Sequence, residues 1–117
     1  MQKLVAINSS VLGYKAAADG KGATALGFGA RAYGRGAVAI GQEAITNTLD
    51  DSAEVEYSVA IGNSARAASN YSVALGSLSL AVIDDDVATK AYLTDETFSK
   101  NNGVVSVGNK AYTFRHP

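Results

Sequence analysis

A 14-residue repeat is the feature of this sequence that most restricts its fold. Segments of the form small–x–Ala–Leu/Ile–Gly recur along the chain, and each ends in an anchor glycine. The spacing of these anchors is constant except for one longer step, and they stand at Gly13, Gly27, Gly41, Gly62 and Gly76. A fixed period of this kind is typical of a solenoid, in which each repeat packs against its neighbours.

The pattern inside each repeat predicts two short β-strands. Larger apolar residues alternate with alanine before each anchor glycine, and a second alternation of small residues, such as Ala30 and Ala32, begins three residues after it. A period of two is the period of a strand. Two strands and two turns in each repeat make one coil of a flattened, all-β parallel roll. We expect its core to contain Val38, Ile40, Val59, Ile61, Val73 and Leu75.

The alanines between those positions are then expected to point outward. The chain has 21 alanines and 12 glycines, so each coil buries little apolar area and a single roll gains limited stability from its core. We therefore expect the roll to pack against copies of itself, with Ala39, Ala60 and Ala74 in the packed surface. The alternative is that these alanines are merely small exposed residues.

The turns and the one long step are also predicted from the repeat. Each anchor glycine is expected to supply a positive φ or a close backbone approach. Gly20 and Gly34 serve the other turn, and Asn70 replaces them in a later coil. The longer step between Gly41 and Gly62 holds extra polar residues, about residues 47–53, which we expect to form a loop pushed out of one coil.

Three segments carry a resemblance to a known family. Residues 58–62 and 72–76 read Ser-Val-Ala-Ile-Gly and Ser-Val-Ala-Leu-Gly, and residues 103–109 read Gly-Val-Val-Ser-Val-Gly-Asn. These resemble the head repeats and the neck motif of YadA-like trimeric autotransporter adhesins. The resemblance implies a left-handed parallel β-roll, a homotrimer and a C-terminal neck that includes Val105, Val107, Gly108, Asn109 and Arg115.

The same resemblance implies how the chain is organised. Residues 1–81 would form the head, and residues 82–102 an irregular insertion that packs beside the neck. Residues 103–117 would form a neck that stops before the coiled-coil stalk. We expect the sequence to be a head-plus-neck fragment of a longer protein.

The function implied by the resemblance is adhesion and a role in virulence. Such heads project from the outer membrane of Gram-negative bacteria and bind host cells, extracellular matrix proteins or one another. Because Arg and Tyr are frequent in binding hot spots, the candidate ligand-binding residues are Arg31, Tyr33, Arg35, Arg66 and Tyr71. The alternative is that these residues only make a repeat face soluble.

Composition argues against several other classes of function. The formal net charge is −1, so no basic surface points to nucleic acid. The absence of cysteine removes disulfides and thiolate metal sites. No apolar run approaches the ~20 residues that span a bilayer, so we expect no direct membrane contact. The glycine-rich stretch 27–36 lacks the helix of a dinucleotide site and the Lys-Ser/Thr of a P-loop, so no cofactor is predicted.

Nothing in the sequence points to catalysis or to a metal. His116 is the sole histidine and has no nucleophile or acid at an interpretable spacing. Residues 84–86 are three aspartates, which we interpret as a solvated turn because a calcium-loop spacing is absent. An alternative is a hexapeptide-repeat acyltransferase, but its longer coil does not fit the period of this chain. A trimeric phage or tailocin fibre segment is the other alternative.

Overall fold

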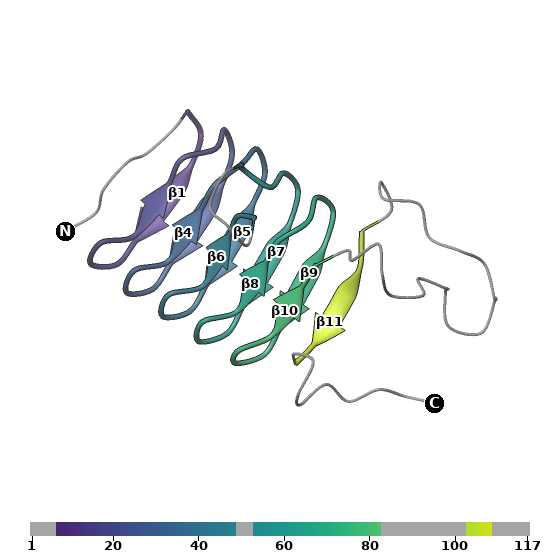
Figure 1. Cartoon of the computed structure of the whole chain (residues 1–117). Helices are drawn as coiled ribbons and strands as arrows, with labels where there is room; N and C mark the ends of the chain where they lie inside the picture. Colours follow the sequence, from purple (N-terminus) through teal and green to yellow (C-terminus); the bar gives the residue numbers. More distant parts are fainter. Residues whose placement is uncertain (1–6, 49–52, 83–102, 109–117) are drawn as a thin grey trace, which may run out of the picture.

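The computed structural model describes residues 7–48, 53–82 and 103–108, which form a parallel β-roll (Figure 1). One sheet has six strands in the order β1-β3-β5-β7-β9-β11, and the other has five in the order β10-β8-β6-β4-β2. The first contains β1 (Ser10–Leu12), β3 (Thr24–Leu26), β5 (Val38–Ile40), β7 (Val59–Ile61), β9 (Val73–Leu75) and β11 (Val105–Val107). The second contains β2 (Ala17–Ala18), β4 (Arg31–Ala32), β6 (Ile45–Thr46), β8 (Arg66–Ala67) and β10 (Leu80–Ala81).

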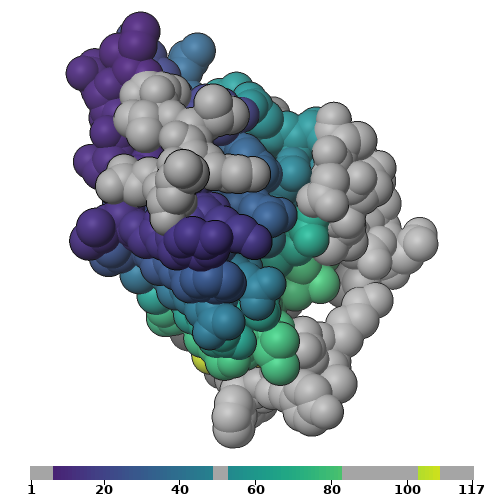
Figure 2. Space-filling view, turned by 90° about the vertical axis from the view of Figure 1, so that its left-hand side faces the viewer, coloured from purple at the N-terminus to yellow at the C-terminus, as the bar shows by residue number. Residues whose placement is uncertain are grey.

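Successive coils are joined by a regular backbone ladder. The amide of Thr24 donates to the carbonyl of Ala37 at 2.8 Å, and the amide of Ala17 donates to the carbonyl of Ala30 at 2.9 Å. Each strand pairs in parallel with the strand one coil away, so equivalent residues stack in rows. The colours in Figure 2, seen from the side of the first coils, follow one another in layers from purple to green. The predicted all-β parallel roll is confirmed.

The anchor glycines have the positive φ that the repeat predicts. Gly41 has a φ of 122°, and a Cβ added to it would lie 2.8 Å from the carbonyl carbon and oxygen of Gly62 in the next coil. Gly13, Gly27 and Gly62 make equally close approaches. A side chain at these positions would therefore be strained and would also push two coils apart.

Gly20 and Gly34 serve the other turn, as the repeat predicts. A Cβ added to Gly20 would clash with the carbonyl oxygen of Gly34, and Gly34 has both a positive φ, of 91°, and a similar close approach to the carbonyl of Val55. The residue two positions before each strand of the six-stranded sheet also has a positive φ. These residues are Asn8, Gly22, Gly36, Tyr57 (φ 51°), Tyr71 (φ 60°) and Gly103.

Asn70 has a different role from the predicted one. It is not among the residues with positive φ, so its predicted replacement of the turn glycine was wrong. Its side-chain oxygen instead accepts a hydrogen bond from the amide of Glu56 at 2.9 Å. Asn70 therefore joins two neighbouring coils through its side chain.

The core consists of alanine, and this reverses the predicted orientation of the six-stranded sheet. Ala39, Ala60 and Ala74 are fully buried within the chain, so they cannot pack against another subunit. Val38, Ile40, Val59, Ile61 and Val73 are only half-buried, and Leu75 is exposed. The prediction that the larger side chains fill the core was therefore wrong.

The physical reason lies in the width of the coil. The two strands of one coil face each other so closely that the rows between them contain little but alanine and serine, and the largest fully buried side chain is Val55. Because side chains in a strand alternate between faces, an error of one residue turns every side chain to the opposite face. The five-stranded sheet keeps its predicted orientation, with Ala30, Ala32, Ala65 and Ala67 buried.

The last described strand is attached by two buried serines. The amide of Val104 donates to Oγ of Ser72 at 3.1 Å, and the amide of Gly108 donates to Oγ of Ser79 at 2.7 Å. Val105 and Val107 point outward from β11. The assignment of residues 103–117 to a neck remains a prediction, and Asn109 and Arg115 lie outside the described residues, as does most of the predicted insertion at 82–102.

Two glycine substitutions should separate the contribution of φ from that of close packing. Gly22→Ala has open space for its methyl group and should lower the free energy of unfolding by about 1 kcal/mol through φ alone. Gly41→Ala adds a clash with the next coil and should lower it by about 3 kcal/mol. Urea denaturation of both variants measures the difference, and equal losses would contradict the role given to the close approach.

Candidate functional site

The outer face of the six-stranded sheet carries an unbroken row of large apolar side chains. We call this row the apolar ladder: Leu12, Leu26, Ile40, Ile61, Leu75 and Val107, which are stacked by the register of the strands. Leu12 is 63% exposed and Leu75 is 45% exposed. A second outward row beside it contains Val38, Val59, Val73 and Val105. A contiguous apolar surface of this kind marks an interaction site.

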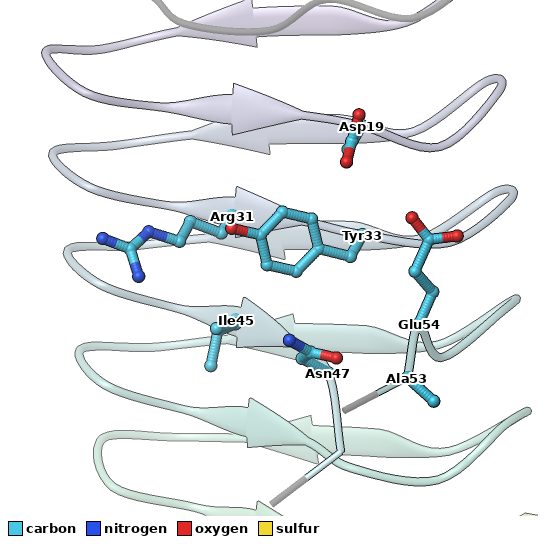
Figure 3. Close-up of a pocket in the computed structure, with 7 residues that line it drawn as sticks. All are labelled: Asp19, Arg31, Tyr33, Ile45, Asn47, Ala53 and Glu54. Atoms are coloured by element: carbon cyan, nitrogen blue, oxygen red, sulfur yellow. The ribbon is translucent and has the colours of Figure 1, made fainter. Parts of the chain in front are cut away.

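The outer face of the five-stranded sheet has a different character, because it carries a groove with polar walls. The groove has a volume of about 510 Å³ and is lined by Asp19, Arg31, Tyr33, Ile45, Asn47, Ala53 and Glu54. In Figure 3 the Tyr33 ring lies along the sheet between Asp19 and Asn47, with Arg31 on one side and Glu54 on the other. The floor therefore comes from the sheet, and one wall comes from the residues around the inserted loop.

The groove forms where the regular backbone hydrogen bonding between neighbouring coils is interrupted. Thr46 occupies an inward position that is alanine in the other coils, and it is fully buried. Its hydroxyl donates to the carbonyl of Tyr33 at 2.8 Å and accepts from the amide of Tyr33 at 3.0 Å. The equivalent amide one coil earlier, that of Asp19, bonds instead to a backbone carbonyl. The hydroxyl of Thr46 thus takes the place of a backbone carbonyl as the partner of Tyr33, which lies at the floor of the groove.

Between β6 and β7 the chain leaves the roll and returns to it, and the outgoing and returning segments are joined to each other by hydrogen bonds. Asn47 and Glu54 form an antiparallel bridge, and the amide of Thr48 donates to the carbonyl of Ala53 at 3.2 Å. Arg66, on β8, donates through Nε to the carbonyl of Asn47 at 3.4 Å and through a terminal nitrogen to that of Thr48. These bonds hold Ala53 and Glu54 beside the groove.

The candidate residues Arg35 and Tyr71 lie away from the groove, along the edge of the roll formed by the turns that lead into the six-stranded sheet. Tyr57 and Tyr71 stack with their ring centroids 5.8 Å apart. The Arg35 guanidinium donates a hydrogen bond to the Tyr57 phenol, which raises the pKa of Arg35 above its ordinary value, and the charge of Glu56 adds to this effect. Both tyrosines occupy positions that strain a bulky residue.

The five candidate residues therefore divide between the region of the groove and the edge formed by the turns. Arg31 and Tyr33 line the groove, and Arg66 bonds to the backbone beside it. Arg35 and Tyr71 lie on the turn edge. Sequence reasoning missed Asp19, Glu54 and Tyr57 as neighbours of these residues. The signal for Asp19 was available, because Asp19 and Tyr33 are one repeat apart and so stack in adjacent coils.

The described part of the chain contains neither a cluster of three metal-ligating side chains nor a helix of the length and hydropathy that a membrane span requires.

The fold and its surfaces define a parallel β-solenoid with one apolar, exposed sheet face. Residues 6–30, 18–44 and 56–79 match the family described as YadA head domain repeat (2 copies), and together they cover more than half of the chain. The chain belongs to this family. No curated protein matches it. YadA head domains are structural adhesin domains of surface-exposed autotransporter adhesins, not an enzyme family, so an adhesin-type role at the cell surface follows.

Substitutions at Thr46 test whether its hydroxyl supports the groove. Thr46→Val keeps the shape but removes both bonds to Tyr33, and it should lower the free energy of unfolding by about 2 kcal/mol. Thr46→Ser keeps the hydroxyl and loses one methyl group, so about 1 kcal/mol is expected. Thermal or urea unfolding measures both variants, and a Val variant as stable as the Ser variant would contradict this role.

Proposed function

We propose that this chain is the head of a bacterial surface adhesin that works as a homotrimer, with the apolar ladders of three subunits packed against one another. The observation that carries this proposal is the apolar ladder itself. It runs through all six strands of one sheet, although the core behind it is alanine. The left-handed coil and the neck implied by the family belong to the same proposal.

The distribution of apolar area supports association. Fully burying a Leu, Ile or Val side chain contributes about 1.5–3 kcal/mol relative to exposure, whereas a buried alanine contributes much less. The two outward rows of the six-stranded sheet together hold ten Leu, Ile and Val side chains, whereas the inward row between them is mostly alanine. Packing copies of that face together would therefore add a hydrophobic core that the single chain lacks.

The arrangement of the two sheets suits multivalent attachment. The apolar ladder and the groove lie on opposite sheets of the roll, so a trimer closed through the ladder would leave three grooves facing outward. Three linked sites bind a surface more tightly than one by about 10²–10⁴. We propose attachment to host cells or extracellular matrix, or autoaggregation, at the outer membrane of a Gram-negative bacterium.

Two isoleucines on opposite sheets provide a matched test of the trimer. Ile61→Glu would bring three carboxylates into the packed ladder, so we expect a trimer of about 36 kDa, three times the 12.0 kDa chain, to dissociate to the monomer mass. Ile45→Glu places the same change on the outer face of the other sheet and should leave the mass unchanged. Light scattering coupled to chromatography measures both.

A monomeric wild-type chain would contradict the proposed trimer. Dissociation by both substitutions would also contradict it, because the effect would then not be specific to the ladder. Circular dichroism of each variant shows whether the roll itself remains folded.

The same variants test multivalent adhesion. Wild-type chain and Ile61→Glu are passed over immobilised matrix proteins and over fixed host cells, and the fraction retained is compared at equal chain concentration. We expect at least a tenfold loss of retention for the monomeric variant, because avidity is lost while each groove is intact. Equal retention by trimer and monomer would argue against avidity as the mechanism.

A further inference from the structure

We propose that the groove on the five-stranded sheet is a saccharide-binding site, in which a sugar ring stacks on Tyr33 and its hydroxyls bond to Asp19, Glu54 and Arg31. This deepens the proposed adhesin function and rests on it for its biological meaning. The groove volume of about 510 Å³ lies within the range of small-molecule sites and accommodates one or two sugar rings.

The polar groups of the groove are available to a ligand. Among the residues that the structure describes, the side chains of Asp19, Arg31 and Glu54 make no hydrogen bond or ion pair with another protein group. All three are exposed and line the same groove. A ligand that bonds to them therefore need not break an existing interaction, and it replaces only water.

The arrangement of donors and acceptors favours hydroxyl groups. Asp19 and Glu54 offer only acceptors, Arg31 offers only donors, and the Tyr33 ring lies between them (Figure 3). A hydroxyl both donates and accepts, so a ligand with hydroxyls around its rim can bond at both sides. A cationic side chain would satisfy the carboxylates but would be repelled by Arg31, and an anion would be repelled by the carboxylates.

Tyr33 provides a fixed surface for the apolar face of a sugar ring. Its backbone is held on both sides by the hydroxyl of Thr46, and its side chain is half-buried on the sheet. Tyr33 directly follows β4, and a ring on a fixed backbone segment loses less conformational freedom when a ligand stacks on it. Ile45 and Ala53 add apolar contact within the same groove.

Saturation-transfer difference NMR on the wild-type chain tests the proposal directly. The probes are the methyl glycosides of glucose, galactose, mannose, N-acetylglucosamine and N-acetylgalactosamine, with N-acetyl-lysine amide as the cationic competitor. We expect at least one glycoside to receive saturation at its ring C–H groups, with a Kd on the order of 1 mM for a single ring. The affinity should be insensitive to salt, because no net charge is neutralised.

Substitutions in the groove locate the binding. Tyr33→Ala should abolish the signal, whereas Tyr33→Phe keeps the ring and should bind within about threefold of wild type. Asp19→Asn and Glu54→Gln should each weaken binding about tenfold, as expected when a charge-assisted hydrogen bond becomes neutral. Tyr14→Ala is the control, because it removes an exposed aromatic ring on a turn away from the groove and should have no effect.

Each possible outcome decides the proposal. Glycoside binding that is lost in Tyr33→Ala and kept in Tyr14→Ala supports it. Salt-sensitive binding of N-acetyl-lysine amide without glycoside binding overturns it in favour of a cation site, and absence of both overturns it altogether. In that last case, retention of the trimer on host surfaces would leave the adhesin function standing. If glycosides bind but trimer and monomer are retained equally, the saccharide site is supported and the avidity mechanism is overturned.

Discussion

The close approach of the two strands within each coil is the constraint on which the rest of this structure depends. A coil made from a single repeat encloses so little space that alanine and serine occupy nearly all of its inward positions. The anchor glycines follow from the same geometry along the roll axis, because parallel coils spaced about 4.8 Å apart leave no room for a Cβ beside a neighbouring carbonyl. Because the interior has so little room for larger side chains, most of the valine, leucine and isoleucine side chains of the six-stranded sheet lie outside. The apolar ladder is thus a direct result of the size of the coil.

The repeat alone was sufficient to predict the architecture but not the orientation of its strands. Period, anchor glycines and two strands per coil could be read from the sequence because each depends on local spacing. Whether Val38 or Ala39 points inward depends on the distance between two sheets, which spacing along the chain does not contain. Hydrophobicity favoured Val38 for the core, and the width of the coil favoured Ala39. The width decides, because a side chain that does not fit cannot gain from burial.

The groove shows the same difference between local and non-local information. Arg31 and Tyr33 were candidates because of their residue types, but the partners that define the site come from other coils and from the base of an inserted loop. Asp19 could have been found by counting one period back from Tyr33. Glu54 could not, because its position depends on how the chain returns to the roll and on the bonds that Arg66 makes to the backbone. Thr46 was hidden among inward alanines, and only its two bonds to Tyr33 mark it as different.

The bridge between Asn47 and Glu54 means that the chain departs from the roll and rejoins it at nearly the same point. The strands on either side keep the pairing that they would have without the extra residues, as the register of Ile45 with Arg66 shows. That corner is therefore a place where segments of different length and chemistry can be exchanged without altering the scaffold. Diversity in what such a roll recognises can arise there by insertion, while the outward row on the opposite sheet is left untouched.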